Sequence, residues 1–161
     1  MITTKFQNPK SLPRLLLSSR WMVGLGCGAR SYTDTLHYSN DYAVGAREVQ
    51  QILQAYIKTP LESFDYVNYG FQLDAEDRRR RFILLSLLSD EGLNEAAYQH
   101  QFGSDVIADF PELSQLFSLN LAIANQQIIS LTETGIERSD VIGAWLFSDR
   151  VNQLMQTYEL K

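Results

Sequence analysis

The feature that most constrains the fold is an apolar run at positions 82–88, in which only Ser86 is polar. Good helix formers precede it, so we expect a helix over about 75–89 that is apolar nearly all round in its second half. A helix of that kind is buried on most of its faces. The sequence therefore predicts that this helix lies at the centre of the core.

Four consecutive arginines, at positions 78–81, belong to the same helix. Successive helical residues turn by about 100°, so these side chains encircle the helix and form no single basic face. Asp74, Glu76 and Asp77 each stand four positions before an arginine, which is the favourable order for ion pairs along a helix. We therefore interpret the run as a paired and solvated helix start rather than a nucleic-acid site.

Short helices are predicted next. Asn94 is a helix N-cap residue and Gly103 a helix C-cap residue, so we expect one short helix between them. Another is expected to start at Ser104 or Pro111 and to end near Leu119.

A β-hairpin should follow, because the apolar segments 121–124 and 127–131 flank a turn at Asn125-Gln126. Thr132 can cap a further helix, and a last amphipathic helix ends the chain. Helices, a two-stranded wing and closing helices make a winged-helix-like domain, so the predicted fold class is α+β and mainly helical. The inner face of the capped helix is expected to carry Ile136, Val141, Ile142, Trp145 and Leu146. The predicted core comprises Leu84, Leu85, Leu88, Leu116, Ile129, Ile142 and Trp145.

The N-terminal part of the chain is organised around three glycines at alternate positions, Gly24, Gly26 and Gly28. Residues 22–25 predict a short buried strand that ends in this glycine turn. Because the glycines leave one face without Cβ atoms, a ligand or another backbone can come close there. A tightly packed strand exit, without any ligand, is the alternative interpretation.

Between the glycine stretch and the helix over 75–89, the sequence predicts a loop, a helix and a strand in turn. Residues 32–41 are polar and aromatic and predict a loop, in which His37 is an ordinary loop residue. Apolar residues at helical spacing predict a helix over about 45–58, which Pro60 ends, and residues 64–71 predict a short strand. We therefore divide the chain into an N-terminal segment, 1–41, and a helical domain, 42–161.

The order of these motifs resembles the oxygen-independent coproporphyrinogen III oxidase-like radical S-adenosylmethionine proteins, a family that also includes haem chaperones. In that family a Gly-x-Gly-x-x-Ala stretch, here 24–29, closes the catalytic barrel, and a separate C-terminal domain follows. An arginine pair opens an apolar helix there, which corresponds to Arg80-Arg81, and the wing runs into a Leu-Thr-x-x-Gly turn, here 131–135. The resemblance covers about residues 20–161. It implies a C-terminal domain or truncated form of such a protein, preceded by a remnant barrel strand.

The resemblance implies a role in porphyrin or haem metabolism, with no catalysis by this chain alone. The family binds a 4Fe–4S cluster, which splits S-adenosylmethionine, through a Cys-x3-Cys-x2-Cys motif. The only cysteine here, Cys27, belongs to no such motif, so we expect no catalytic residue, metal site or cofactor in this chain alone. Arg30 replaces an apolar residue of the oxidase proper, so the resemblance does not extend to that enzyme's second-cofactor role. The residues that the resemblance places near the cofactor are Gly24, Gly26, Gly28, Ala29 and Arg30.

Charge and hydrophobicity limit the classes of partner that this chain can bind. The net charge is −5, and no Lys or Arg lies between Phe82 and Glu137, which disfavours nucleic acid. A winged-helix interaction or nucleic-acid-binding module is the alternative function. No apolar run approaches the roughly 20 residues that span a bilayer, so we expect a cytoplasmic protein without a membrane partner. The expected partners are a missing barrel supplied in trans, or a second copy bound through the N-terminal strand. Residues 1–20 are interpreted as a truncation scar or a divergent start.

Overall fold

The computed structural model describes residues 22–40, 43, 45–67 and 70–157. Their contacts divide them into two compact units, one ending at Asp74 and the other beginning at Ala75. Helices predominate, and the strands form two small antiparallel sheets, one in each unit. The predicted fold class, α+β and mainly helical, is confirmed.

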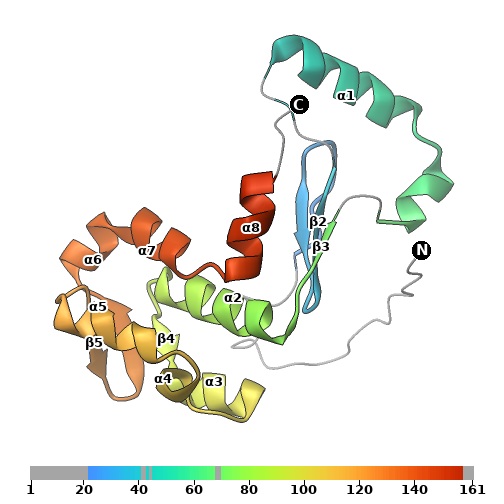
Figure 1. Ribbon diagram of the computed structural model, residues 1–161. Helices are drawn as coiled ribbons and strands as arrows, with labels where there is room; N and C mark the ends of the chain where they lie inside the picture. Colours follow the sequence, from blue (N-terminus) through green and yellow to red (C-terminus); the bar gives the residue numbers. More distant parts are fainter. Residues whose placement is uncertain (1–21, 41–42, 44, 68–69, 158–161) are drawn as a thin grey trace. The chain divides into compact units, whose positions relative to one another are not determined.

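The first unit is a three-stranded antiparallel sheet with a helix between its second and third strands (Figure 1). Strands β1 (Arg30–Tyr32), β2 (Leu36–Ser39) and β3 (Gly70–Gln72) lie in the order β1-β2-β3. Helix α1 (Ala46–Lys58) confirms the helix predicted over 45–58, and its C-cap is Thr59, just before Pro60. A short 3-10 helix, η2 (Leu61–Asp65), follows it.

Three local predictions in this unit are wrong. At positions 22–25 the strand is reduced to a single bridge between Met22 and Tyr32, because the glycine turn reverses the chain upon itself. The loop predicted over 32–41 contains β2, which pairs with a strand on each side; local polarity does not reveal such tertiary pairing. Among the described residues of the strand predicted over 64–71, only those of β3 form a strand, because Pro60 begins the 3-10 turn in which the Ser63 amide donates to the Pro60 carbonyl.

The first sheet also crosses residue 41, which we predicted as the end of the N-terminal segment. β2 lies before that position and β3 after it, and His37 is paired with Phe71. Contacts divide the described chain into its two compact units between Asp74 and Ala75.

The second unit contains the central helix, a small sheet and a series of short helices. Helix α2 (Ala75–Leu87) leads to β4 (Leu93–Asn94) and α3 (Glu95–Phe102). Then come α4 (Val106–Asp109), the 3-10 helix η3 (Pro111–Leu113) and α5 (Ser114–Ser118). The hairpin of β5 (Ala122–Asn125) and β6 (Ile128–Leu131) is followed by α6 (Glu133–Glu137), α7 (Ser139–Trp145) and α8 (Asp149–Thr157).

Local capping signals are confirmed in this unit. The Asn94 side chain accepts a hydrogen bond from the Ala97 amide at 2.9 Å, and Gly103 ends α3 with a φ of 75°. The single helix predicted to end near Leu119 is instead three short pieces. Phe110 leaves the helical conformation before Pro111, as the residue before a proline tends to do.

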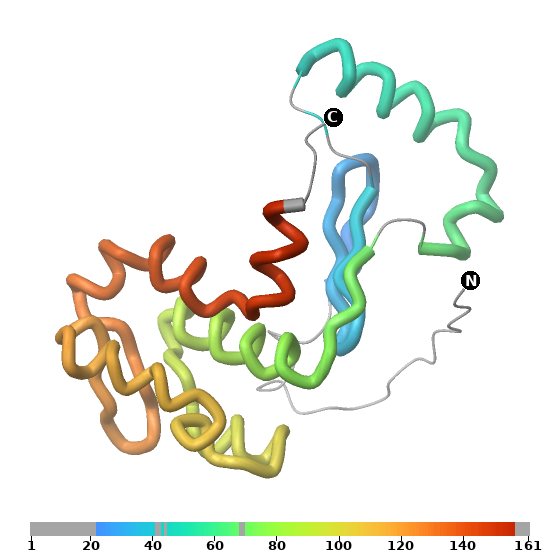
Figure 2. The backbone as a smooth tube through the Cα atoms, viewed as in Figure 1, coloured from blue at the N-terminus to red at the C-terminus, as the bar shows by residue number. Residues whose placement is uncertain are grey.

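The predicted hairpin is present, with its turn one residue later than expected. Asn125 pairs with Ile128, so Gln126 and Gln127 form the two-residue turn, with φ values of 48° and 67°. Positive φ at both positions is the geometry that matches the twist of the flanking strands. In Figure 2 the hairpin is the narrow orange loop. β6 lies at the centre of the second sheet, between β4 and β5, and α2 packs on β4 and β6.

The hydrophobic core lies in the second unit. Thirteen buried hydrophobic residues are found in the described chain, and all of them fall between Ile83 and Leu146. Helix α2 contributes Ile83 and Leu87 as its buried face, while Leu85 and Leu88 are 42% and 44% exposed. The predictions of Leu85, Leu88 and Trp145 as core residues are therefore wrong. Of the predicted inner face of the closing helix, Ile142 and Leu146 are buried, whereas Ile136, Val141 and Trp145 are exposed.

Candidate functional site

The glycine stretch folds into a tight hairpin that closes on its own backbone. Met22 and Tyr32 exchange two backbone hydrogen bonds, at 2.9 and 2.7 Å. The Gly24 amide donates to the hydroxyl of buried Ser31 at 3.1 Å. A Cβ atom at Gly24 would lie 2.6 Å from the Arg30 carbonyl oxygen, so this position requires glycine. The close approach predicted from the sequence is thus made, at Gly24, by the chain itself.

Gly26 and Gly28 form the open end of this hairpin. Their φ values are +105° and +79°, and no described atom lies within 4 Å of a Cβ built at either position. The Ala29 amide closes the turn by donating to the Gly26 carbonyl at 3.2 Å, and the Asn40 side chain reaches the same oxygen at 3.4 Å. These two glycines are needed for backbone conformation rather than for space. The hairpin therefore brings four of the predicted cofactor residues together, and Arg30 follows as an exposed residue of β1.

The residues of this hairpin do not fit an iron–sulfur cluster. Cys27 is the only thiol in the sequence, and it is partly buried. A cluster held by protein thiolates needs several of them. No group of three or more His, Cys, Asp or Glu side chains suited to a metal ion occurs in the described part of the chain.

A second set of polar side chains gathers around Asp109 at the end of α4. Its carboxylate accepts hydrogen bonds from Ser104 at 2.5 Å and Tyr98 at 2.8 Å, and it lies 3.3 Å from Arg79. The hydrogen bonds from Ser104 and Tyr98 hold the pKa of Asp109 below its usual value. Burial, and then the bond to Asp109, raise the pKa of Tyr98. The cluster joins α2, α3 and α4.

The neighbouring arginine, Arg80, has a similar structural role. It pairs with Glu76 at 2.7 Å and with Glu112 at 3.2 Å, and it donates to the Leu146 carbonyl at 3.4 Å. Its guanidinium also lies 4.8 Å from the centre of the Phe110 ring. The pair of Glu76 and Arg80 confirms the predicted spacing of four. Arg80 is not merely solvated, however, because it ties α2 to elements 32 and 66 residues away in the sequence.

The start of α2 is joined to the start of α8. Asp77 is buried and accepts a hydrogen bond from Ser148 at 2.7 Å, and it forms an ion pair with Arg150. The same Ser148 hydroxyl accepts from the Val151 amide at 3.2 Å, so it also caps α8. Sequence spacing did not reveal these contacts, since the partners are more than 70 residues apart.

The Leu-Thr-x-x-Gly turn has a specific geometry at the end of the hairpin. The Thr132 hydroxyl accepts from the Gly135 amide at 3.1 Å and donates to the Asn120 carbonyl at 2.8 Å. The Thr132 amide donates to the Leu121 carbonyl at 2.9 Å. A Cβ atom at Gly135 would lie only 2.0 Å from that same carbonyl oxygen. The motif therefore locks α6 against the segment that enters β5.

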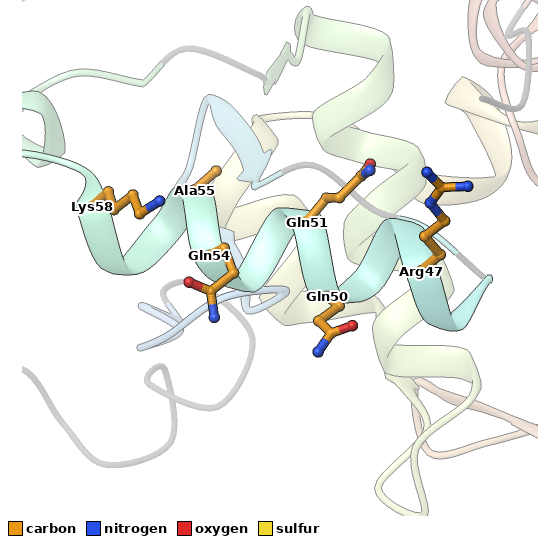
Figure 3. Close-up of a pocket in the computed structure, with 6 residues that line it drawn as sticks. All are labelled: Arg47, Gln50, Gln51, Gln54, Ala55 and Lys58. Carbon is orange, nitrogen blue, oxygen red and sulfur yellow. The ribbon is translucent and has the colours of Figure 1, made fainter.

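A shallow hollow runs along α1 and is lined by five polar side chains and Ala55, which Figure 3 shows along one helix. All of its lining residues belong to α1, so no second element forms an opposing wall and the hollow is not a built binding site. The lining residues are Arg47, Gln50, Gln51, Gln54, Ala55 and Lys58.

None of the helices in the described ranges is long and apolar enough to cross a membrane.

One known protein family matches part of the second unit. Residues 73–137 match the family model described as the HemN C-terminal domain. The match begins two residues before the second unit and ends at the last residue of α6. Neither the curated proteins nor the solved structures include a significant match to the chain. The predicted resemblance is thus confirmed over residues 73–137, which are similar to the HemN C-terminal domain.

Proposed function

We propose that the chain is the C-terminal portion of a cytoplasmic coproporphyrinogen III oxidase-like radical S-adenosylmethionine protein that serves porphyrin or haem metabolism. It acts with a cluster-bearing barrel supplied in trans and does not catalyse alone. The HemN C-terminal domain match over residues 73–137 carries this proposal. The single cysteine supports this proposal, because residues 1–161 supply one thiolate and a cluster needs several.

The first unit supports the proposed barrel partner. None of its described hydrophobic side chains is buried, although its helix α1 has an apolar stripe at helical spacing, formed by Val49, Ile52, Leu53 and Tyr56. A sheet and an amphipathic helix gain stability by burying an apolar face against a second layer. Val49 and Leu53 are 38% and 43% exposed, so this face is available to a partner. We assign it to the barrel.

The glycine hairpin is the second part of the proposed contact. Gly26 and Gly28 carry no side chains at the open end of the hairpin, and Arg30 stands exposed beside them. In the assembled protein the backbone of this hairpin would lie near the cofactor of the barrel, and Arg30 would supply a positive charge to an anionic group there. The cluster and S-adenosylmethionine supply the radical chemistry, and this chain contributes binding surface.

The test combines the purified chain with a separately purified radical S-adenosylmethionine barrel protein that lacks a C-terminal domain, taken from the same cell. After anaerobic reconstitution with iron and sulfide, we expect no cluster absorbance from the chain alone. With the barrel present, we expect co-elution of the two proteins and an increased yield of the S-adenosylmethionine cleavage product. A cluster in the isolated chain that survives Cys27→Ser would contradict the proposal, as would failure to co-elute.

Two variants of α1 locate the contact. Leu53→Asp places a charge on the apolar stripe and should abolish co-elution, because the carboxylate would be desolvated in the interface. Gln51→Asp places the same charge on the polar face, where Gln51 lines the open hollow, and should leave co-elution unchanged. Equal losses in both variants would show that the stripe does not bind the barrel.

A further inference from the structure

We draw no further inference here: the strongest candidate, the uncharged outer edge of strand β5 with half-exposed Ile123, has no strand partner among the described residues, and nothing in the structure shows what covers it.

Discussion

Replacing Gly135 by alanine should lower the free energy of unfolding of the second unit, although alanine is the better helix former. The Cβ atom would lie 2.0 Å from the Leu121 carbonyl oxygen, and ordinary contact begins at about 3.4 Å. Helix α6 and the segment before β5 would therefore have to move apart by about 1.4 Å. The Leu121 carbonyl also accepts the hydrogen bond of the Thr132 amide, so this movement would weaken that hydrogen bond.

The magnitude follows from three opposing contributions. Inserting a methyl group into a filled site costs about 1–3 kcal/mol, and weakening one backbone hydrogen bond costs about 1 kcal/mol. Alanine returns about 0.5–1 kcal/mol, because glycine loses more backbone entropy when it enters a helix. We expect a net loss of about 2 kcal/mol in the free energy of unfolding. For a domain of this size, that corresponds to a fall of about 10 °C in melting temperature.

Gly143→Ala is the matched control, because it makes the same change within helix α7. A Cβ atom there would lie 3.6 Å from a Leu84 methyl carbon and 3.8 Å from one of Leu88, which is ordinary contact. This variant should gain the helix preference without a clash, so its melting temperature should rise by a few degrees. Thermal melts followed by far-ultraviolet circular dichroism measure both variants. If Gly135→Ala melts at or above the unmodified chain, the steric argument fails.

Three further predictions concern charge and domain structure. Two hydroxyl donors lower the pKa of Asp109, so its stabilising effect is complete above the ordinary aspartate pKa of about 3.9 and is lost as the pH falls through the lowered value. Asp109→Asn should therefore melt below the unmodified chain at neutral pH, and the two curves should converge in acid; a gap that stays constant with pH would refute this. A shortened chain that begins at Leu73 should keep a cooperative melt near that of the full chain, because every buried hydrophobic residue of the described structure lies in the second unit; loss of the transition would show that the first unit completes the core. Random duplex DNA should not bind at physiological salt, because no Lys or Arg lies between Phe82 and Glu137; micromolar binding that is lost on raising the salt concentration would overturn the charge argument.

Much of the second unit could be predicted from the sequence, because its signals act within a few residues. The Asn94 side chain accepts a hydrogen bond from a backbone amide at the start of α3, and the Gly103 amide donates to a carbonyl at its end, so both ends of this helix were predictable. The hairpin and the Thr132 cap were predictable for the same reason. The family resemblance depended on the glycine stretch at 24–29, on Arg80-Arg81 and on the Leu-Thr-x-x-Gly turn at 131–135, and the match over 73–137 covers the last two of these.

The faces of the helices were decided by tertiary packing. Helix α2 is apolar nearly all round after its arginines, so its periodicity did not distinguish buried Ile83 from exposed Leu85. In the closing helices a change of direction at Arg138 separates α6 from α7, and Trp145 is left partly exposed. Which side of an apolar helix is buried depends on elements that pack against it from elsewhere in the chain.

The polar clusters and the first sheet depended on tertiary structure still more. Asp109 binds Tyr98 and Arg79 from two other helices, and buried Asp77 meets Arg150 from a helix 73 residues away. In the glycine stretch the sequence by itself determined where the chain turns, because glycine adopts positive φ values more readily than other residues do. The sequence did not determine whether a ligand, a partner or the chain itself approaches Gly24. The pairing of Met22 with Tyr32 brings the chain's own backbone there. Such pairing joins segments that local sequence does not connect.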